Sequence, residues 1–268
     1  MAMQTDYALN TIGMLKTQGR IIHALMLRNL KTRFGGNEFG FFAMTVVWPL
    51  SHILILILIN TGLGRTAPYG DSVALWFATG LVPYLGFQYM SRLIMLGVVF
   101  NRPLLAFPLV KFTDILFASA IVEVLNAGLV VLIVCAIFWA LGINFMPLDV
   151  VQASLALLTM MLLGLAYGVI AAIVATAVPG AIMFFFGFQI VLWLSSGIVF
   201  VPDALPESVR VPLSYLPTLQ GVEWMRSAYY EGYGATILDK TYMFSFAIVM
   251  LFVGLTLERL VRGRILHW

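Results

Sequence analysis

Charged residues are what this sequence has least of. Only 10% of its 268 residues are Asp, Glu, Lys or Arg, and 62% are hydrophobic, whereas an ordinary globular domain has about 25% charged residues. The longest stretch without a charged residue runs from Val150 to Pro202. As one helix it would be about 80 Å long, while the hydrocarbon core of a bilayer is only about 30 Å thick. The composition therefore excludes a water-soluble fold. The stretch predicts two spanning helices that meet at Val178-Pro179-Gly180, because proline cannot continue a helix and glycine permits a reversal.

The residue patterns of catalytic and metal sites are also missing. Cys135 is the only cysteine, which excludes an intramolecular disulfide and suggests a small core residue. His23, His52 and His267 fall in three different zones of the chain, so isolated histidines are favoured over a metal site. There is no Gly-rich loop followed by Lys-Ser or Lys-Thr and no Gly-x-Ser-x-Gly elbow. Ser195-Ser196-Gly197 is better interpreted as helix packing than as a nucleophile, and we do not expect an enzyme.

What the sequence does contain is a series of apolar windows. Each is close to the roughly 20 residues that a spanning helix needs. Besides the long stretch, these windows are Phe39–Gly64, Ser72–Ser91, Val124–Leu148 and Thr241–Leu257. The predicted fold class is therefore an all-α integral membrane protein with six transmembrane helices. Residues 1–38 form a cytoplasmic N-terminus with an amphipathic interface helix, and residues 39–268 form the six-helix transmembrane domain. A removable signal peptide is not expected, because basic residues and no cleavage pattern precede the first window.

The placement of lysine and arginine predicts the orientation. If both chain ends lie on one side, four cations lie on the other: Arg65, Arg210, Arg226 and Lys240. The side of the termini holds Lys16, Arg20, Arg28, Lys31, Arg33, Arg92, Arg102, Lys111, Arg259, Arg262 and Arg264. Because cytoplasmic loops carry the excess of positive charge, both termini are predicted to be cytoplasmic.

Three segments are not expected to span. Ile12–Phe34 separates apolar from basic positions and predicts an amphipathic helix on the inner leaflet. Val99–Thr113 is a cytoplasmic loop too apolar for an idle linker, so it indicates a contact surface. Pro202–Asp239 lies outside and mixes prolines with Trp224 and several tyrosines. This composition predicts a short re-entrant or interfacial helical pair before the last helix.

Polar and aromatic residues inside the apolar windows are the candidate functional residues. Glu123 is the one carboxylate well inside a span; structural pairing or a protonated state is favoured over a transport role. Gly164 and Gly168 predict close helix contact. On the first spanning helix, Trp48 and His52 share a face. On the fifth, residues of the same kinds recur at spacings of 4, 4, 3 and 4: Phe185, Gln189, Trp193, Ser196 and Phe200. Packing between helices and the lining of a pathway are both consistent with these two faces.

Four motifs together resemble a known family. They are Leu30–Gly35, Trp48–His52, Gly80–Tyr84 and Asn101–Leu104. The chain resembles the type-2 ABC exporter permeases, particularly those that export bacterial capsular polysaccharide, over nearly its whole length. The resemblance implies an exporter in the bacterial inner membrane that moves a lipid-linked anionic polymer outward.

The resemblance also implies partners and residue roles. Two permease copies would work with two separate ATP-binding subunits, which bind ATP and Mg, so this chain itself needs no cofactor. The substrate partner would be lipid-linked polysaccharide, with periplasmic and outer-membrane export proteins as further partners and no nucleic acid. Coupling to the ATPase is implied for Arg33, Arg102, Pro103, Leu104 and Leu105. The channel would be lined by Trp48, His52, Phe185, Gln189, Trp193, Ser196 and Phe200. An outer gate is implied for Glu223 and Arg226.

One departure from the family pattern keeps the transported polymer open. Leu216-Pro217 replaces the Asn-Pro of related capsule permeases, and Gln220 stands where a histidine is expected. O-antigen, teichoic acid and small-drug export are rivals within the same fold. A secondary transporter would need internal repeats or several intramembrane charges, and neither is evident.

Overall fold

The chain folds into a bundle of helices. The computed structural model describes residues 2–33, 40, 43–233 and 236–266, and every element in these ranges is a helix, which confirms the all-α class for the described part. The long helices are α1 (Ala2–Arg33), α3 (Trp48–Gly62), α4 (Val73–Asn101), α5 (Phe112–Ala140), α6 (Val150–Ala177), α7 (Ala181–Leu194) and α10 (Lys240–Leu266). The shorter elements are a π-helix η1 (Ala43–Val47), the 3-10 helices η2 (Arg102–Ala106) and η3 (Pro202–Ala204), and the helices α8 (Glu207–Ser214) and α9 (Pro217–Tyr229).

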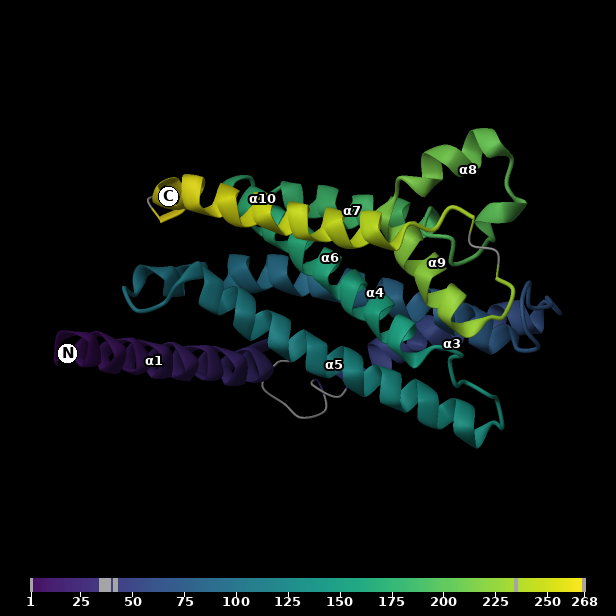
Figure 1. Ribbon diagram of the computed structural model, residues 1–268, viewed down its shortest axis with the longest axis horizontal. Coiled ribbons are helices and arrows are strands. Elements are labelled where there is room, and N and C mark those ends of the chain that lie inside the picture. Colours follow the sequence, from purple (N-terminus) through teal and green to yellow (C-terminus); the bar gives the residue numbers. More distant parts are fainter. Residues whose placement is uncertain (1, 34–39, 41–42, 234–235, 267–268) are drawn as a thin grey trace.

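The bundle has two distinct ends. In Figure 1 the long helices run along the long axis, and the N-terminus, the C-terminus and the α4–α5 connection lie at one end, here called the terminal end. The helices α8 and α9 lie at the opposite end. The element order therefore places Arg102 and Lys111 at the terminal end and Arg65, Arg210 and Lys240 at the opposite end. These five cations lie at the ends that the sequence predicts for them.

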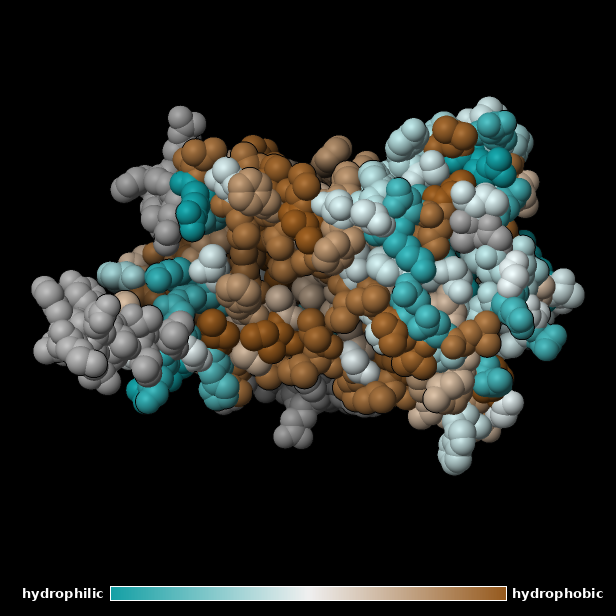
Figure 2. Space-filling model, in the orientation of Figure 1, coloured by the Kyte–Doolittle hydropathy of each residue, from teal (hydrophilic) through white to brown (hydrophobic). Residues whose placement is uncertain are grey.

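Within the described part of the chain, three helices are long and apolar enough to cross a membrane: α5, α6 and the Lys240–Val261 part of α10. The apolar helices α3 and α7 are shorter, and the 29-residue α4 carries Pro83 and Arg92 within its length. Figure 2 shows hydrophobic surface over the middle of the molecule and hydrophilic residues toward both ends. This distribution is typical of a bundle embedded in a bilayer. The count of six spans stays a prediction, and so does the depth of α8 and α9, whose helical pair matches the expected one.

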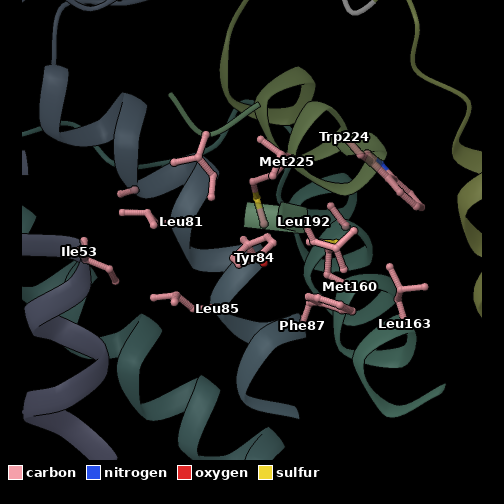
Figure 3. Packing of buried hydrophobic residues seen from close by; sticks show 14 of the residues in the cluster. Ile53, Leu81, Tyr84, Leu85, Phe87, Met160, Leu163, Leu192, Trp224 and Met225 are labelled. Atoms are coloured by element: carbon pink, nitrogen blue, oxygen red, sulfur yellow. The ribbon is translucent and has the colours of Figure 1, made fainter. Parts of the chain in front are cut away.

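Helix α6 lies at the centre of the bundle because two glycines let α4 approach it closely. A Cβ atom at Gly164 would lie 2.5 Å from the carbonyl oxygen of Phe87, and one at Gly168 would lie 2.7 Å from that of Ser91. Larger residues would push the helices apart, so the small-residue stripe serves packing, as predicted. Beside this contact, Tyr84 and Phe87 of α4 converge with residues of α6 and α7 (Figure 3).

Two helices extend well beyond their apolar windows. The window predicted from Ser72 to Ser91 belongs to α4, which continues to Asn101. The window predicted to begin at Val124 belongs to α5, which begins at Phe112. The physical reason is that a charged residue marks the edge of an apolar segment, whereas an α-helix accommodates charged residues in its interior. The α4–α5 loop is therefore shorter than the predicted Val99–Thr113 segment.

Helix α1 packs beside α5 rather than across the end of the bundle (Figure 1). The side-chain amide of Gln18 donates a hydrogen bond to the carboxylate of Asp114. The Asn29 amide donates to the Ser119 hydroxyl at 3.4 Å, and Leu25 is buried. Polar contacts thus hold one face of α1 against α5. The amphipathic pattern of the sequence did not predict this contact, because the buried face mixes polar and apolar residues.

Candidate functional site

A groove between α3 and α7 brings together three of the predicted channel residues. Trp48 and His52 of α3 and Trp193 of α7 line a cavity of about 280 Å³. Trp48 and His52 are four residues apart on one helix face, and their ring centroids lie 5.3 Å apart in an edge-to-face arrangement. We call this cavity the aromatic groove. Its wall offers ring faces, an imidazole and the Ser51 hydroxyl among aliphatic side chains.

His52 is held in place by two contacts. Its Nδ1 atom lies 2.9 Å from the backbone carbonyl oxygen of Trp48 and 3.3 Å from the hydroxyl oxygen of Tyr89 on α4. The Tyr89 ring also meets the imidazole edge-to-face. These contacts hold the imidazole ring between α3 and α4. The position of His52 in the groove wall is therefore fixed by the protein itself.

The predicted single face on the fifth spanning helix is wrong beyond Trp193, because α7 ends at Leu194. Gly197 then has a φ of 77°, a backbone conformation in which glycine is strongly favoured and which turns the chain. Ser196 is fully buried and donates to the carbonyl oxygen of Trp193 at 2.7 Å. Phe200 lies past this turn and off the helix. Phe185, on α7 itself, packs edge-to-face on Tyr167 of α6 at 5.6 Å.

Gln189 points into the bundle instead of into the groove. Its side chain is only 2% exposed. The Oε1 atom accepts a hydrogen bond from Nε of Arg92 at 2.6 Å, and the Nε2 atom donates to the Ser91 hydroxyl. Its backbone carbonyl accepts from the Tyr84 hydroxyl at 2.6 Å. Gln189 thus ties α7 to α4, and Arg92, counted from the sequence among the cytoplasmic cations, has a specific partner inside the bundle.

At the opposite end, Arg226 of α9 is enclosed completely. Its guanidinium donates to the backbone carbonyls of Gly197 at 2.7 Å and Ile198 at 2.9 Å, in the turn after α7. Its Cζ atom lies 3.6 Å from the ring centroid of Trp76, the geometry of a cation–π contact. Glu223, one turn earlier on α9, lies 3.8 Å from Arg226. The two predicted gate residues are therefore together, and they join α9 to the start of α4 and the end of α7.

Glu223 has an unusual environment for a carboxylate. Burial raises the pKa of Glu223 to about 7, although the hydroxyl of Tyr233 and the nearby Arg226 both act to lower it. Tyr233 donates to Oε1 at 2.7 Å, whereas Oε2 is buried and bonds to none of the described residues. Burial also lowers the pKa of Arg226, yet a guanidinium keeps its proton in proteins. Close to neutral pH the pair therefore shifts between a neutral and a charged carboxyl.

Gln220, which stands where a histidine is expected, makes hydrogen bonds through both ends of its side-chain amide. Its Nε2 atom donates to the backbone carbonyls of Ser214 at 2.7 Å and Ile237 at 2.8 Å. Its Oε1 atom accepts from the backbone N–H of Asp239 at 2.8 Å. One amide thus makes three hydrogen bonds that hold the ends of α8 and α10 together, whereas an imidazole has only two ring nitrogens.

The predicted ATPase-coupling residues lie at the terminal end. Arg102, Pro103, Leu104 and Leu105 form the 3-10 helix η2 between α4 and α5. Leu104 and Leu105 pack inward on a buried cluster that includes Leu25 of α1. The side chain of Arg33 lies outside the described side chains. Phe100 and Phe107, which belong to the predicted contact surface, are exposed, and so is Leu109 of the same segment.

The helical bundle, its apolar middle and its aromatic groove define a protein of the helical membrane-embedded class. No protein-family model matches the chain. It is 28% identical over 239 residues to the polysialic acid transport protein KpsM of Escherichia coli, covering 89% of this chain and 92% of that protein. It is 26% identical over 244 residues, 91% of each chain, to the capsule polysaccharide export inner-membrane protein CtrC of Neisseria meningitidis serogroup B. The corresponding protein BexB of Haemophilus influenzae is 24% identical over 245 residues, 91% of this chain and 92% of BexB.

These similarities confirm the resemblance found in the sequence. The chain is a homologue of inner-membrane proteins named for capsule polysaccharide export or polysialic acid transport. The relatives are named for transport or export and not for an enzymatic reaction.

Proposed function

We propose that this chain is the transmembrane permease subunit of an ATP-driven exporter that moves lipid-linked capsular polysaccharide across a bacterial inner membrane. The observation that carries the proposal is the match to KpsM, CtrC and BexB over about nine-tenths of the chain. A match of this length includes most of the helices and of the loops between them. A transport role also agrees with a fold that embeds an aromatic groove in an apolar bundle.

The terminal end is proposed to face the cytoplasm. Arg102 and Lys111 of the α4–α5 connection and Arg259 of α10 lie there, and cytoplasmic loops are the ones enriched in lysine and arginine. In this orientation η2 and the exposed apolar side chains of Phe100 and Phe107 face the compartment that holds ATP. They are the proposed docking point for the separate ATP-binding subunits.

The aromatic groove is proposed to line the pathway between two permease copies. Helices α3 and α7 each expose large apolar side chains, among them Leu58 and Phe184, which a second copy can cover. A sugar polymer needs ring faces for stacking and a few polar groups for its hydroxyls. Aromatic contacts contribute about 0.5–1.5 kcal/mol each beyond burial. Several weak contacts in a row suit a polymer that must slide rather than bind tightly.

At the opposite end, Glu223 and Arg226 are proposed to hold the outer gate. They connect α9 with the turn after α7. A movement of α7 would therefore displace α9 as well. These contacts support a coupling of the proposed pathway helix to the proposed gate.

The direct test is deletion of the gene in its own host. The proposal predicts that capsular polysaccharide disappears from the cell surface and accumulates inside, and that the wild-type gene restores export. Loss of polymer both outside and inside would instead indicate a role in synthesis. Undiminished surface capsule would contradict the proposal, and loss of O-antigen in its place would select that rival substrate.

A further inference from the structure

A second cavity lies beside the aromatic groove, between α3, α4 and α5. It has a volume of about 350 Å³ and almost entirely apolar walls. Four polar side chains line it: Tyr89 and Arg92 from α4, and Glu123 and Asn126 from α5. We call it the α4–α5 cleft. Neither the relatives nor the proposed transport pathway assigns it a role.

The cleft continues toward the opposite end as an apolar slot. A further cavity of about 200 Å³ between α4, α5 and α6 shares three wall residues with it: Val82, Val131 and Leu157. The slot exists because α5 packs along α4 and hardly touches α6. The combined shape is a polar chamber with a narrow apolar extension, which suits an amphiphile with an alkyl chain.

Two contacts with residues of α7 hold the guanidinium of Arg92 in position. Its Nε atom donates to Gln189 at 2.6 Å, and its Cζ atom lies 5.1 Å from the ring centroid of Phe186. Among the described residues, the Gln189 contact is the guanidinium's only hydrogen bond. Its two terminal nitrogens are therefore available to the cleft, and the planar fork of arginine matches the geometry of a phosphate group.

The carboxylate of Glu123 lies at the same level as Arg92. Arg92 precedes the end of α4 at Asn101 by about 14 Å, and Glu123 follows the start of α5 at Phe112 by about 16 Å, at 1.5 Å per residue. Because the two helices are antiparallel and joined by a short loop, both charges lie at one depth. The Nδ2 atom of Asn126 is 3.5 Å from the Glu123 carboxylate. The cleft thus presents a guanidinium and a carboxyl group on facing helices.

This depth corresponds to the lipid head groups of one leaflet. Helices α4 and α5 have 29 residues each, about 43 Å, so each exceeds the roughly 30 Å hydrocarbon core by about 13 Å. With the apolar parts of both helices in the hydrocarbon, the excess projects at the terminal end. Arg92 and Glu123 then lie at the boundary of the cytoplasmic leaflet.

We propose that the α4–α5 cleft binds a phospholipid with an ethanolamine head group. Its phosphate would meet Arg92, its ammonium group would meet Glu123, and one acyl chain would fill the slot past Val131 and Leu157. A purely anionic head group would bring its charge against the Glu123 carboxylate. A choline head group has no N–H to donate to that carboxylate. The ethanolamine head group complements both charges.

Such a lipid would support the wall of the aromatic groove. Trp48 lines both the groove and the α4–α5 cleft, and Tyr89 of the cleft contacts His52 of the groove. A bound lipid therefore fixes the start of α3 against α4. This consequence for export rests on the proposed function, whereas lipid binding itself does not.

The test uses the full-length protein in vesicles that contain a photoactivatable phospholipid. Three probes carry the same reactive acyl chain and an ethanolamine, choline or glycerol head group, and the cross-linked residues are mapped by mass spectrometry. The ethanolamine probe should label the slot at least several times more strongly than the other two. Arg92→Gln and Glu123→Gln should each lower its labelling about tenfold, the change that corresponds to about 1.4 kcal/mol.

Two further variants keep the test decisive. Val131→Phe fills the slot without changing a charge and should abolish labelling, while Arg65→Gln at the opposite end should leave it unchanged. Equal labelling by the three probes would overturn the proposal. Stronger labelling by the glycerol probe that only Arg92→Gln reduces would also overturn it, in favour of an anionic occupant. Normal labelling with failed export would leave this site standing and count against the proposed transport role.

Discussion

Arg226 and the half-buried Arg92 lie in opposite kinds of surroundings. Arg226 has an aromatic ring on one face and backbone carbonyls within hydrogen-bonding distance, and it is fully enclosed. Arg92 also faces an aromatic ring, yet among the described residues its guanidinium bonds only to Gln189, and it lines an open cavity. A guanidinium whose terminal nitrogens bond to backbone carbonyls of the protein, as in Arg226, stabilises the fold. One whose donors face a cavity is placed to meet a ligand.

The largest effect is expected from Arg226→Ala. It leaves the carbonyls of Gly197 and Ile198 without their donor and Glu223 without its cation. Breaking a buried pair in this way costs about 3–5 kcal/mol, so the protein should become scarce in the membrane and unfold at lower temperature. Arg210→Ala is the control, because its 4.0 Å contact with Asp203 is partly exposed and such pairs contribute at most about 1 kcal/mol. Equal abundance of the Arg226→Ala and Arg210→Ala proteins would contradict a structural role of Arg226.

A smaller effect is expected from Gln189→Leu. The change removes the acceptor of the Arg92 Nε–H group, and an unsatisfied buried donor costs about 1–3 kcal/mol. Arg92→Gln keeps a polar side chain of similar shape in contact with the cleft and should cost less stability than Gln189→Leu. Thermal unfolding of the two variants checks this order. The reverse order would mean that Arg92 serves the fold in the same way as Arg226.

The protonation of Glu223 predicts a pH dependence. Because burial raises the pKa of Glu223 to about 7 from about 4.3 in the unfolded chain, the folded state binds a proton that the unfolded state releases. This contribution is fully present below about pH 4.3 and is lost as the pH rises through about 7. Stability should fall by about 1 kcal/mol between pH 6 and pH 8. In Glu223→Gln the dependence in this window should disappear, and its persistence would assign it to another group.

The sequence predicts features that neighbouring residues determine better than contacts between residues far apart in the chain. Apolar windows and the cation distribution are local, and they predicted the helical class and the two ends. The length of α4 and the end of α7 were missed, because charge does not end a helix and because Gly197 was interpreted as packing rather than as a turn. The pairing of Arg92 with Gln189 joins residues 97 positions apart. The sequence therefore placed Arg92 only among the cytoplasmic cations.

The smallest effect per residue is expected in the aromatic groove. Each of Trp48→Ala and Trp193→Ala removes one weak contact surface of about 0.5–1.5 kcal/mol, so single changes should reduce surface polysaccharide only mildly and the double change clearly. The pair Phe185→Ala with Trp193→Ala should act in the same direction. Trp139→Ala, at a tryptophan that is 77% exposed on α5, is the matched control. Normal export by the double variants at equal protein abundance would favour the packing interpretation of these residues.

The central claim, that the polymer passes along the aromatic groove, is tested most directly by trapping the polymer in transit. A photoreactive phenylalanine analogue replaces Trp193 in one strain and Trp139 in another, and cells are irradiated while they export polysaccharide. We predict that the protein with the analogue at position 193 becomes covalently linked to polysaccharide, that the link requires a functional ATP-binding subunit, and that position 139 gives none. Linking at position 139 but not at position 193 during normal export would contradict the account.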